Sequence, residues 1–196
     1  MPELFRVGLT GNIASGKSSV VGVWRALGAH VIDADVLARQ AIAPGTPGHA
    51  RVLAEFGTDD RAQLRDIVFR EPDQREKLEQ IIHPEVARLR ALREAELAGQ
   101  GVAIVVNDIP LLFEAGLGDQ FDMIVLVDAP PEQRVQRIVQ NRGIQRPEAE
   151  RMVAAQLPAE QNRRHAAVVI DNDGSMEALR RKAEEAWHTI RARASA

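Results

Sequence analysis

The sequence predicts an open α/β fold built on five parallel strands flanked by helices. Five short runs consist almost entirely of Val, Ile and Leu, which is typical of strands buried on both faces of a parallel sheet. Longer stretches with helical periodicity separate these runs, as right-handed crossovers between parallel strands require. The expected strands are residues 5–9, 30–33, 102–108, 123–128 and 168–171.

The helices expected around these strands follow from periodicity and from their stop signals. The first begins inside a glycine-rich turn after residues 5–9, and Gly28 ends it. The others lie between or after the later strands. The expected helices of this set are residues 16–27, 85–98, 131–141, 147–156 and 175–193.

Two intervals are too long for a single crossover helix. Residues 41–99 show helical patterns at 49–56, 60–69 and 73–82, followed by His83-Pro84, and proline at that point is expected to end the last of them. Residues 130–165 also exceed a simple crossover. We therefore expect one domain over residues 1–196 with a helical insertion at about 41–99 and a second elaboration at about 130–165.

Composition excludes several classes of protein. The 196 residues include no cysteine, so a disulfide framework and thiolate chemistry are excluded. No apolar run approaches ~18 residues, so no membrane span is expected, and no secretory leader is visible; a cytoplasmic protein is the expectation.

The charge is unevenly distributed along the chain. The net charge is −3, yet residues 130–165 hold seven arginines against four glutamates. This local excess favours a small anionic ligand over nucleic acid, although a solvated helix face would give the same pattern. Only three of the 25 Lys and Arg residues are lysines: Lys17, Lys77 and Lys182.

One of these lysines completes a phosphate-binding loop (P-loop). Residues 11–18 match G-x-x-x-x-G-K-[ST] between an expected strand and an expected helix, as the motif demands. Backbone N–H groups of such a loop and the N-terminus of its helix bind phosphate oxygens. The lysine reaches the β- and γ-phosphates, and the following serine is placed to ligate Mg²⁺. The predicted phosphate-binding residues are Gly11, Asn12, Ile13, Ala14, Ser15, Gly16, Lys17, Ser18 and Ser19.

A P-loop establishes nucleotide binding but leaves three classes of function open: a GTPase switch, an ATPase motor and a small-acceptor kinase. A guanine-specific switch would need N-K-x-D, which the sequence lacks, and the D-x-x-G at 171–174 follows the last expected strand. A motor needs an acid on a Walker B strand, for which Asp108 or Asp128 would serve. The motor class is therefore weakened but stays open.

Two carboxylates suggest an acceptor site. Asp33 and Asp35 follow the second expected strand, and ligands of open α/β sheets bind beyond the carboxyl ends of the strands. Phosphoryl transfer to an alcohol needs a group that accepts or orients the hydroxyl proton. Helix capping is the alternative role of an aspartate at such a junction.

A longer set of motifs resembles one family. GLTGNIASGKSS, VIDADVLAR, IIHP, IPLLFE, QNRG and VIDN-x-G occur in this order across about residues 5–175. Together they resemble the dephospho-coenzyme A (CoA) kinase family. The resemblance implies transfer of the γ-phosphate of ATP to the ribose 3′-hydroxyl of dephospho-CoA, the last step of CoA synthesis. It also implies Mg²⁺, a P-loop kinase fold, CoA binding by the 41–99 insertion and a lid at 130–165.

The resemblance implies roles for individual residues. Asp35 would orient or deprotonate the 3′-hydroxyl, with Asp33 beside it at the acceptor or metal. Lys17 and the lid residues Arg137 and Arg142 would act on the ATP phosphates, and Arg39 would meet a phosphate of the acceptor. The CoA side would be lined by His83, Pro84, Pro110, Leu111, Leu112 and Glu114. ATP and dephospho-CoA are the implied partners, without nucleic acid or membrane; the oligomeric state stays open.

Structural alternatives apply to several of these residues. Leu111, Leu112 and Phe113 have the character of core residues, and Trp24 and Trp187 are expected in the core. The arginines expected to be solvated are Arg134, Arg146 and Arg151. Asn12 and Ala14 replace glycines common in the family but lie at wildcard positions, so no loss of function is expected. A kinase of another small acceptor, such as a nucleoside monophosphate, and a nucleotide-binding switch are the alternative functions.

Overall fold

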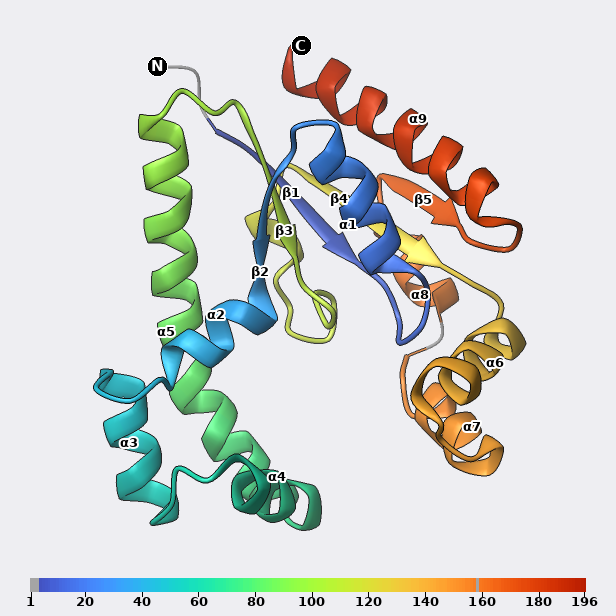
Figure 1. Cartoon of the computed structure of the whole chain (residues 1–196). Coiled ribbons are helices and arrows are strands. Elements are labelled where there is room, and N and C mark those ends of the chain that lie inside the picture. The colour runs from blue at the N-terminus through green and yellow to red at the C-terminus, as the bar shows by residue number, and fades with distance from the viewer. Residues whose placement is uncertain (1–3, 158) are drawn as a thin grey trace. The chain divides into compact units, whose positions relative to one another are not determined.

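The computed structural model describes residues 4–157 and 159–196, which form two compact units (Figure 1). The sheet unit comprises residues 4–32 and 100–196, and the helical unit comprises residues 33–99. Residues 1–3, on which the expectation about a secretory leader partly depends, lie outside the described residues, as does residue 158.

The sheet has five strands in the order β2-β3-β1-β4-β5, and this confirms the predicted fold class. β1 pairs in parallel with β3 on one side and β4 on the other, and β4 pairs in parallel with β5. Val7 of β1 lies in register with Val106 and Met123 on the two sides. The strands are β1 (Phe5–Thr10), β2 (His30–Asp33), β3 (Ile104–Asp108), β4 (Met123–Asp128) and β5 (Val168–Asp171).

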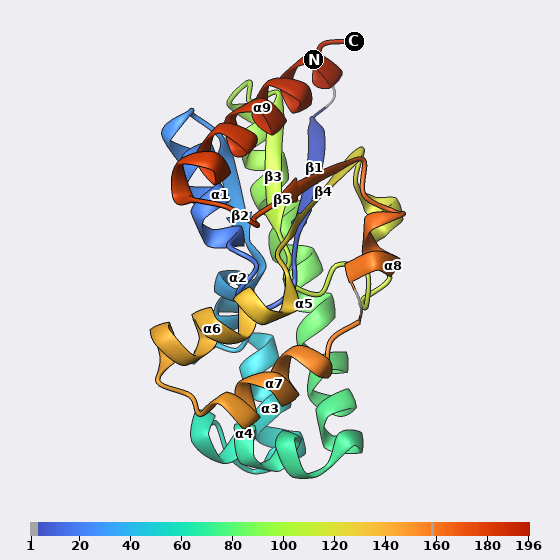
Figure 2. The same ribbon diagram turned by 90° about the vertical axis from the view of Figure 1, so that its right-hand side faces the viewer.

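Helices cover the faces of the sheet and extend from the end of β4 (Figure 2). α1 (Lys17–Ala26) and α9 (Met176–Ala194) lie side by side on one face, and α8 (Ala159–Arg163) lies across from them. α6 (Pro131–Arg142) packs against α7 (Arg146–Ala154), and a short 3₁₀ helix η1 occupies Gly118–Gln120. The expected helices of this unit are confirmed to within about two residues; α8 and η1 had no clear sequence signal.

The α1–α9 face holds the main hydrophobic core. Trp24 is fully buried, Trp187 is nearly so, and their ring centroids lie 5.8 Å apart. The Trp24 indole N–H donates a 2.8 Å hydrogen bond to the carbonyl of Ala183 in α9. The prediction that both tryptophans are core residues is confirmed, and Trp24 joins α1 to α9 by both packing and a hydrogen bond.

We expect Trp24→Phe to lower the free energy of unfolding by about 2–4 kcal/mol, because it leaves a cavity and removes the donor of a buried carbonyl. Urea denaturation followed by circular dichroism measures the change. Leu27→Ala is the control, since Leu27 is 45% exposed and should change stability by about 0.5 kcal/mol or less. Equal losses in the two variants would contradict the assigned importance of Trp24.

The helical unit corrects one prediction. α5 (Pro72–Gly99) is continuous, whereas the sequence predicted two helices separated at His83-Pro84. Pro84 removes one intrahelical hydrogen bond at a cost of about 3 kcal/mol, and contacts of α5 with the other helices of the unit offset that loss. The other helices are α2 (Ala34–Ala41), α3 (Pro47–Phe56) and α4 (Arg61–Arg70).

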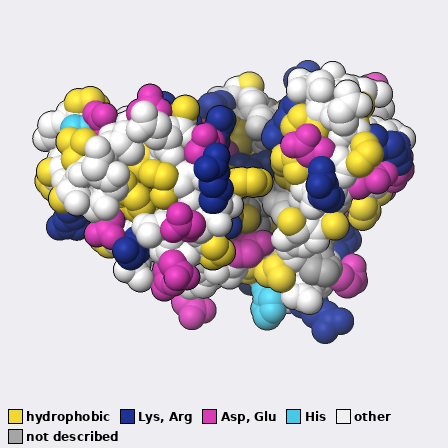
Figure 3. Space-filling model, turned by 90° about the horizontal axis from the view of Figure 1, so that it is seen from below, with side chains coloured by type: hydrophobic (Ala, Val, Ile, Leu, Met, Phe, Trp, Pro, Cys, Tyr) yellow, Lys and Arg dark blue, Asp and Glu magenta, His cyan; other side chains and the backbone are white. Residues whose placement is uncertain are grey.

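The surface carries both signs of charge side by side, with scattered apolar side chains (Figure 3). Exposed ion pairs such as Arg75–Glu79 and Arg146–Glu150 contribute to this pattern. Across the described ranges, none of the helices combines the length and apolar character that a bilayer crossing requires.

Candidate active site

The P-loop lies between β1 and α1 and presents an open helix N-terminus. α1 begins at Lys17, and Gly16 occupies the N-cap with φ +99° and no side-chain cap. The first turn of α1 contains no acidic residue. The positive end of α1 is thus not neutralised by its own first turn, which suits it to bind a phosphate group.

Lys17 is the cation of this site. Its ammonium group pairs with the carboxylate of Asp108 at the end of β3, and the two side chains are only 15% and 10% exposed. The pair places the lysine ammonium at the end of β3, the strand next to β1. Asp108 is one of the two residues that the sequence offered as a Walker B acid.

Gly16 is required by two independent constraints. Its φ of +99° is a backbone conformation that residues with a side chain rarely adopt. In addition, a Cβ atom added to Gly16 would lie 2.2 Å from the side-chain nitrogen of Asn172. We expect Gly16→Ala to weaken ATP binding at least about tenfold by distorting the loop. The matched control is Gly22→Ala in the same helix, where no atom lies within 4 Å of the added Cβ. Calorimetric titration with ATP measures both variants, and equal affinities would contradict the constraint.

Two side chains hold the carbonyl side of the P-loop. The Asn172 amide, at the end of β5, donates a 2.7 Å hydrogen bond to the Ser15 carbonyl. Arg137 of α6 donates to the carbonyls of Ala14 (3.1 Å) and Asn172 (3.1 Å). These hydrogen bonds fix the conformation of the loop backbone at Ala14 and Ser15. Sequence reasoning assigned Asn172 no role, although it belongs to the VIDN-x-G motif.

The wildcard positions of the P-loop contact α6 and α7. Asn12 donates to the Leu157 carbonyl (3.1 Å), and the Ile13 N–H donates to the side-chain carbonyl of Gln156 (2.8 Å). Ala14 adopts a left-handed φ of +59°, which a non-glycine residue rarely adopts. Ile13 and Ala14 pack against an apolar cluster formed by Val135, Ile138, Ala149 and Val153. No sequence signal pointed to Gln156.

The arginines of α6 and α7 differ in environment. Arg146 and Arg151 are exposed as predicted, but Arg134 is only 5% exposed, so the prediction of a solvated Arg134 is wrong. Its guanidinium lies under the side chain of Gln156, which binds the P-loop, and this packing explains the burial. Arg142, the last residue of α6, is exposed and forms no hydrogen bond or ion pair within the described part of the chain.

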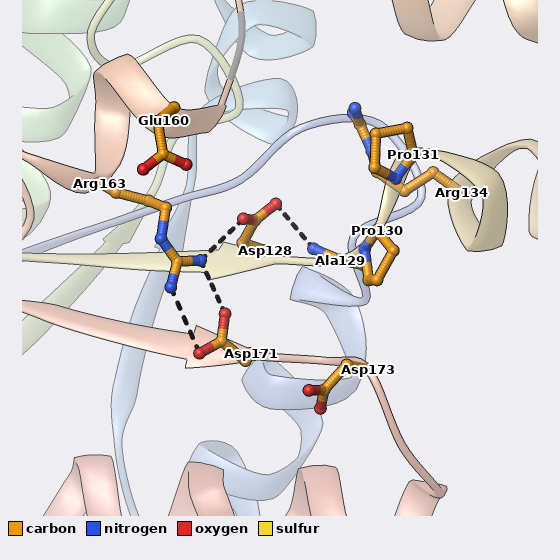
Figure 4. Close-up of a pocket in the computed structure, with 9 residues that line it drawn as sticks. All are labelled: Asp128, Ala129, Pro130, Pro131, Arg134, Glu160, Arg163, Asp171 and Asp173. Atoms are coloured by element: carbon orange, nitrogen blue, oxygen red, sulfur yellow. Dashed lines mark hydrogen bonds and ion pairs between the residues drawn. The ribbon is translucent and has the colours of Figure 1, made fainter.

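A pocket lies where β4 and β5 end (Figure 4). Arg163 of α8 crosses it and binds the carboxylates of Asp128 (2.9 Å) and Asp171 (2.7 Å), which raise the pKa of Arg163 well above its usual value. Asp128 also accepts the N–H of Ala129 (2.8 Å). These contacts fasten α8 to the sheet.

The predicted acceptor residues Asp33, Asp35 and Arg39 lie in the helical unit. One carboxylate oxygen of Asp33 caps α2 by accepting the N–H groups of Asp35 (2.9 Å) and Val36 (3.0 Å). Asp35 and Arg39 are exposed, and in the described chain neither side chain has a hydrogen bond or an ion pair. Asp33 thus has the capping role, while the Asp35 carboxylate stays available.

The residues predicted to line the CoA side fall into two groups. In the sheet unit, the Pro110 carbonyl accepts the Thr10 hydroxyl (3.0 Å) beside the P-loop, Leu111 and Glu114 are exposed, and Leu112 is fully buried under Gly8. In the helical unit, His83 and Pro84 are exposed on α5. Leu112 packs against β1 in the core, as its core character predicted, whereas the prediction of core character for Leu111 is wrong, since Leu111 is 41% exposed.

Comparisons with known proteins identify relatives over nearly the whole chain. A family model described as dephospho-CoA kinase matches residues 5–178. The dephospho-CoA kinase of Geobacter metallireducens is 44% identical over 189 residues, covering 92% of this chain and 94% of that protein. A Thermus thermophilus crystal structure shares 37% identity with a TM-score of 0.82, covering 95% and 97% of the two chains. A Campylobacter jejuni dephospho-CoA kinase structure, 23% identical with a TM-score of 0.71 over 94% and 96%, shares the fold.

Proposed function

This chain belongs to the dephospho-CoA kinase family, and we propose that it transfers the γ-phosphate of ATP to the ribose 3′-hydroxyl of dephospho-CoA. The observation that carries the proposal is a family match over residues 5–178 in a chain whose P-loop retains every required residue. The structure supports it with an uncapped α1 N-terminus and with a P-loop lysine whose ammonium group pairs with Asp108 at the end of β3.

On the donor side, we assign residues 11–19 to the phosphates of ATP. The loop N–H groups and the N-terminus of α1 bind phosphate oxygens, and Lys17 stabilises the charge on the transferring phosphoryl group. Arg142 is the second cation proposed for this group, since its exposed guanidinium has no partner among the described residues. We assign Arg137 to ATP binding as well, because it donates a hydrogen bond to a carbonyl of the P-loop and so fixes the loop that binds the phosphates.

On the acceptor side, the Asp35 carboxylate orients the 3′-hydroxyl and accepts its proton. The 3′-oxygen forms a bond to the γ-phosphorus, the bond from that phosphorus to the β–γ bridging oxygen breaks, and ADP leaves. Arg39, one turn after Asp35 on α2, is assigned to a phosphate of the acceptor.

Mg²⁺ fits the residues present. Proteins bind Mg²⁺ in nucleotide sites through one or two oxygen ligands together with substrate phosphates. The exposed Ser18 hydroxyl in the first turn of α1 supplies such an oxygen, and Asp33 has one carboxylate oxygen without a capping bond. Bound Mg²⁺ neutralises charge on the β- and γ-phosphates. Within the described residues no cluster of three or more acidic or histidine ligands exists, and such a site does not need one.

The two elaborations of the fold receive the remaining roles. We assign CoA binding to the insertion at about 41–99, with His83 and Pro84, and to Pro110, Leu111 and Glu114 after β3. Leu112, whose side chain is fully buried, supports this segment from the core. The segment at about 130–165 is proposed as the lid that excludes water from the transferring phosphoryl group.

An ADP-release assay tests the function and its alternatives. The enzyme is incubated with ATP and Mg²⁺ and then with dephospho-CoA, with a panel of nucleoside monophosphates, or with no acceptor. ADP release stimulated only by dephospho-CoA is the expected result. Stimulation by a nucleoside monophosphate would instead support another small-acceptor kinase, and acceptor-independent turnover would support a nucleotide-binding switch.

A further inference from the structure

Arg134 is a buried cation with few partners. Arg134 lies in α6, and it is buried, with 5% of its surface exposed. Within the described residues its guanidinium makes one long hydrogen bond, 3.4 Å to the side-chain carbonyl of Gln156, and its Nε atom has no acceptor. Burying an arginine without a carboxylate partner is costly, so its presence at this position needs an explanation.

The nearest candidate acid already has other partners. Asp128 lies close enough for its charge to oppose the lowering of the Arg134 pKa that burial causes. The Asp128 carboxylate, however, binds Arg163 and the N–H of Ala129. In Figure 4 Arg134 stands beside Pro131, away from the Arg163–Asp128–Asp171 contacts. Asp171 likewise binds Arg163 and is 45% exposed. The charge of Arg134 is therefore not neutralised in a direct ion pair.

The guanidinium lies beside the phosphate loop. The Gln156 carbonyl that it contacts also accepts the N–H of Ile13, so Arg134 is two hydrogen bonds away from a P-loop amide. Ile13 also packs against Val135 and Ile138 of the same helix. Arg134 also lines the pocket of Figure 4, but its side chain is largely buried, so solvent screens its charge less than that of a surface arginine, and the charge would attract an anion bound in the loop.

We propose that Arg134 is a phosphate-binding determinant of this enzyme: a buried cation that raises affinity for ATP by attracting its phosphates into the P-loop and by orienting Gln156. This inference rests on the proposed use of the P-loop for ATP. It makes Arg134 a positioning residue, because its effect reaches the nucleotide through the field and through Gln156.

The proposal predicts opposite effects on stability and binding. Arg134→Met removes a buried charge and keeps the apolar volume, so the melting temperature of the free protein should stay equal or rise. The same change should weaken ATP binding roughly tenfold, because a poorly screened positive charge is lost. A purely structural arginine would give the reverse: a lower melting temperature and unchanged affinity.

Calorimetric titration with ATP, together with thermal unfolding of the free protein, tests these effects in Arg134→Met, Arg134→Lys and the control Arg151→Met. Arg151 is exposed on α7, so its change should leave the affinity within about twofold of wild type. Lysine preserves the charge at position 134 and should retain affinity within about threefold. Should the methionine variant unfold, Arg134→Gln replaces it.

The outcomes separate the two proposals. Weak binding by the methionine or glutamine variant, with lysine close to wild type, supports the inference. Wild-type affinity in the uncharged variant, or equally weak binding by the lysine variant, overturns it while the proposed function stands. Absence of ATP binding by the wild-type protein would instead contradict the proposed function.

Discussion

Asp35→Asn should abolish most phosphoryl transfer to dephospho-CoA while ATP still binds. General-base catalysis contributes about 10²–10⁴-fold, and kcat should fall by a factor in this range. The amide keeps the shape of the side chain but accepts no proton. Because Asp33, and not Asp35, caps α2, the substitution should leave the helix intact. Steady-state assays with saturating dephospho-CoA measure kcat, and calorimetric titration measures ATP affinity.

Asp66→Asn is the matched control for this prediction. Asp66 is an exposed aspartate of α4 in the same helical unit, and its change removes the same charge. We expect kcat within about twofold of wild type, as for surface substitutions away from specific contacts. Full turnover by Asp35→Asn would contradict the proposed role of Asp35. Equal losses of kcat in both variants would show that the net charge of the helical unit, and not a specific role of Asp35, lowers kcat.

Lys17→Met should lower kcat/KM by about 10²–10⁴-fold, because a positioned cation on the transferring phosphoryl group is lost. The substitution also leaves Asp108 without its ion pair to this lysine, so a lower melting temperature is expected as well. Thermal unfolding of the free protein separates that effect from catalysis. Assays are run well below the melting temperature of the variant.

Lys77→Met serves as the control for Lys17. Lys77 is exposed in the helical unit and pairs at the surface with Glu55, which raises the pKa of the lysine. Exposed pairs contribute little, so activity should stay within about twofold of wild type. If Lys17→Met retained wild-type activity in a folded protein, the assignment of the P-loop lysine to the phosphoryl group would be wrong.

Much of the sheet unit could be predicted because its signals are local. Strand runs such as MIVLVD at β4 and the glycines of the P-loop report burial and backbone conformation directly. The continuous α5 was not predictable, because the preference of Pro84 is overridden by contacts between residues distant in sequence. Arg134 was misjudged for the same reason. Its burial depends on the packing of α6 near the P-loop, and a charged residue in an arginine-rich stretch carries no sign of that.

The candidate site shows the same division. The loop motif predicted residues 11–19 as a group, but not that Gln156 and Asn172 would bind its backbone. Those two contacts join residues more than 140 positions apart. Patterns in a single sequence report the spacing of residues within one helix or strand. A side chain that hydrogen-bonds to the backbone of a loop distant in sequence produces no such pattern.

The contacts on the carbonyl side of the P-loop have a consequence for ligand-linked unfolding. Any ligand that binds only the folded loop stabilises every element whose unfolding would release that loop. Here those elements include α6 through Arg137, α7 through its apolar cluster, and the end of β5 through Asn172. Nucleotide should therefore slow amide exchange and proteolysis well beyond the residues that touch it, with the sheet unit responding as one cooperative body.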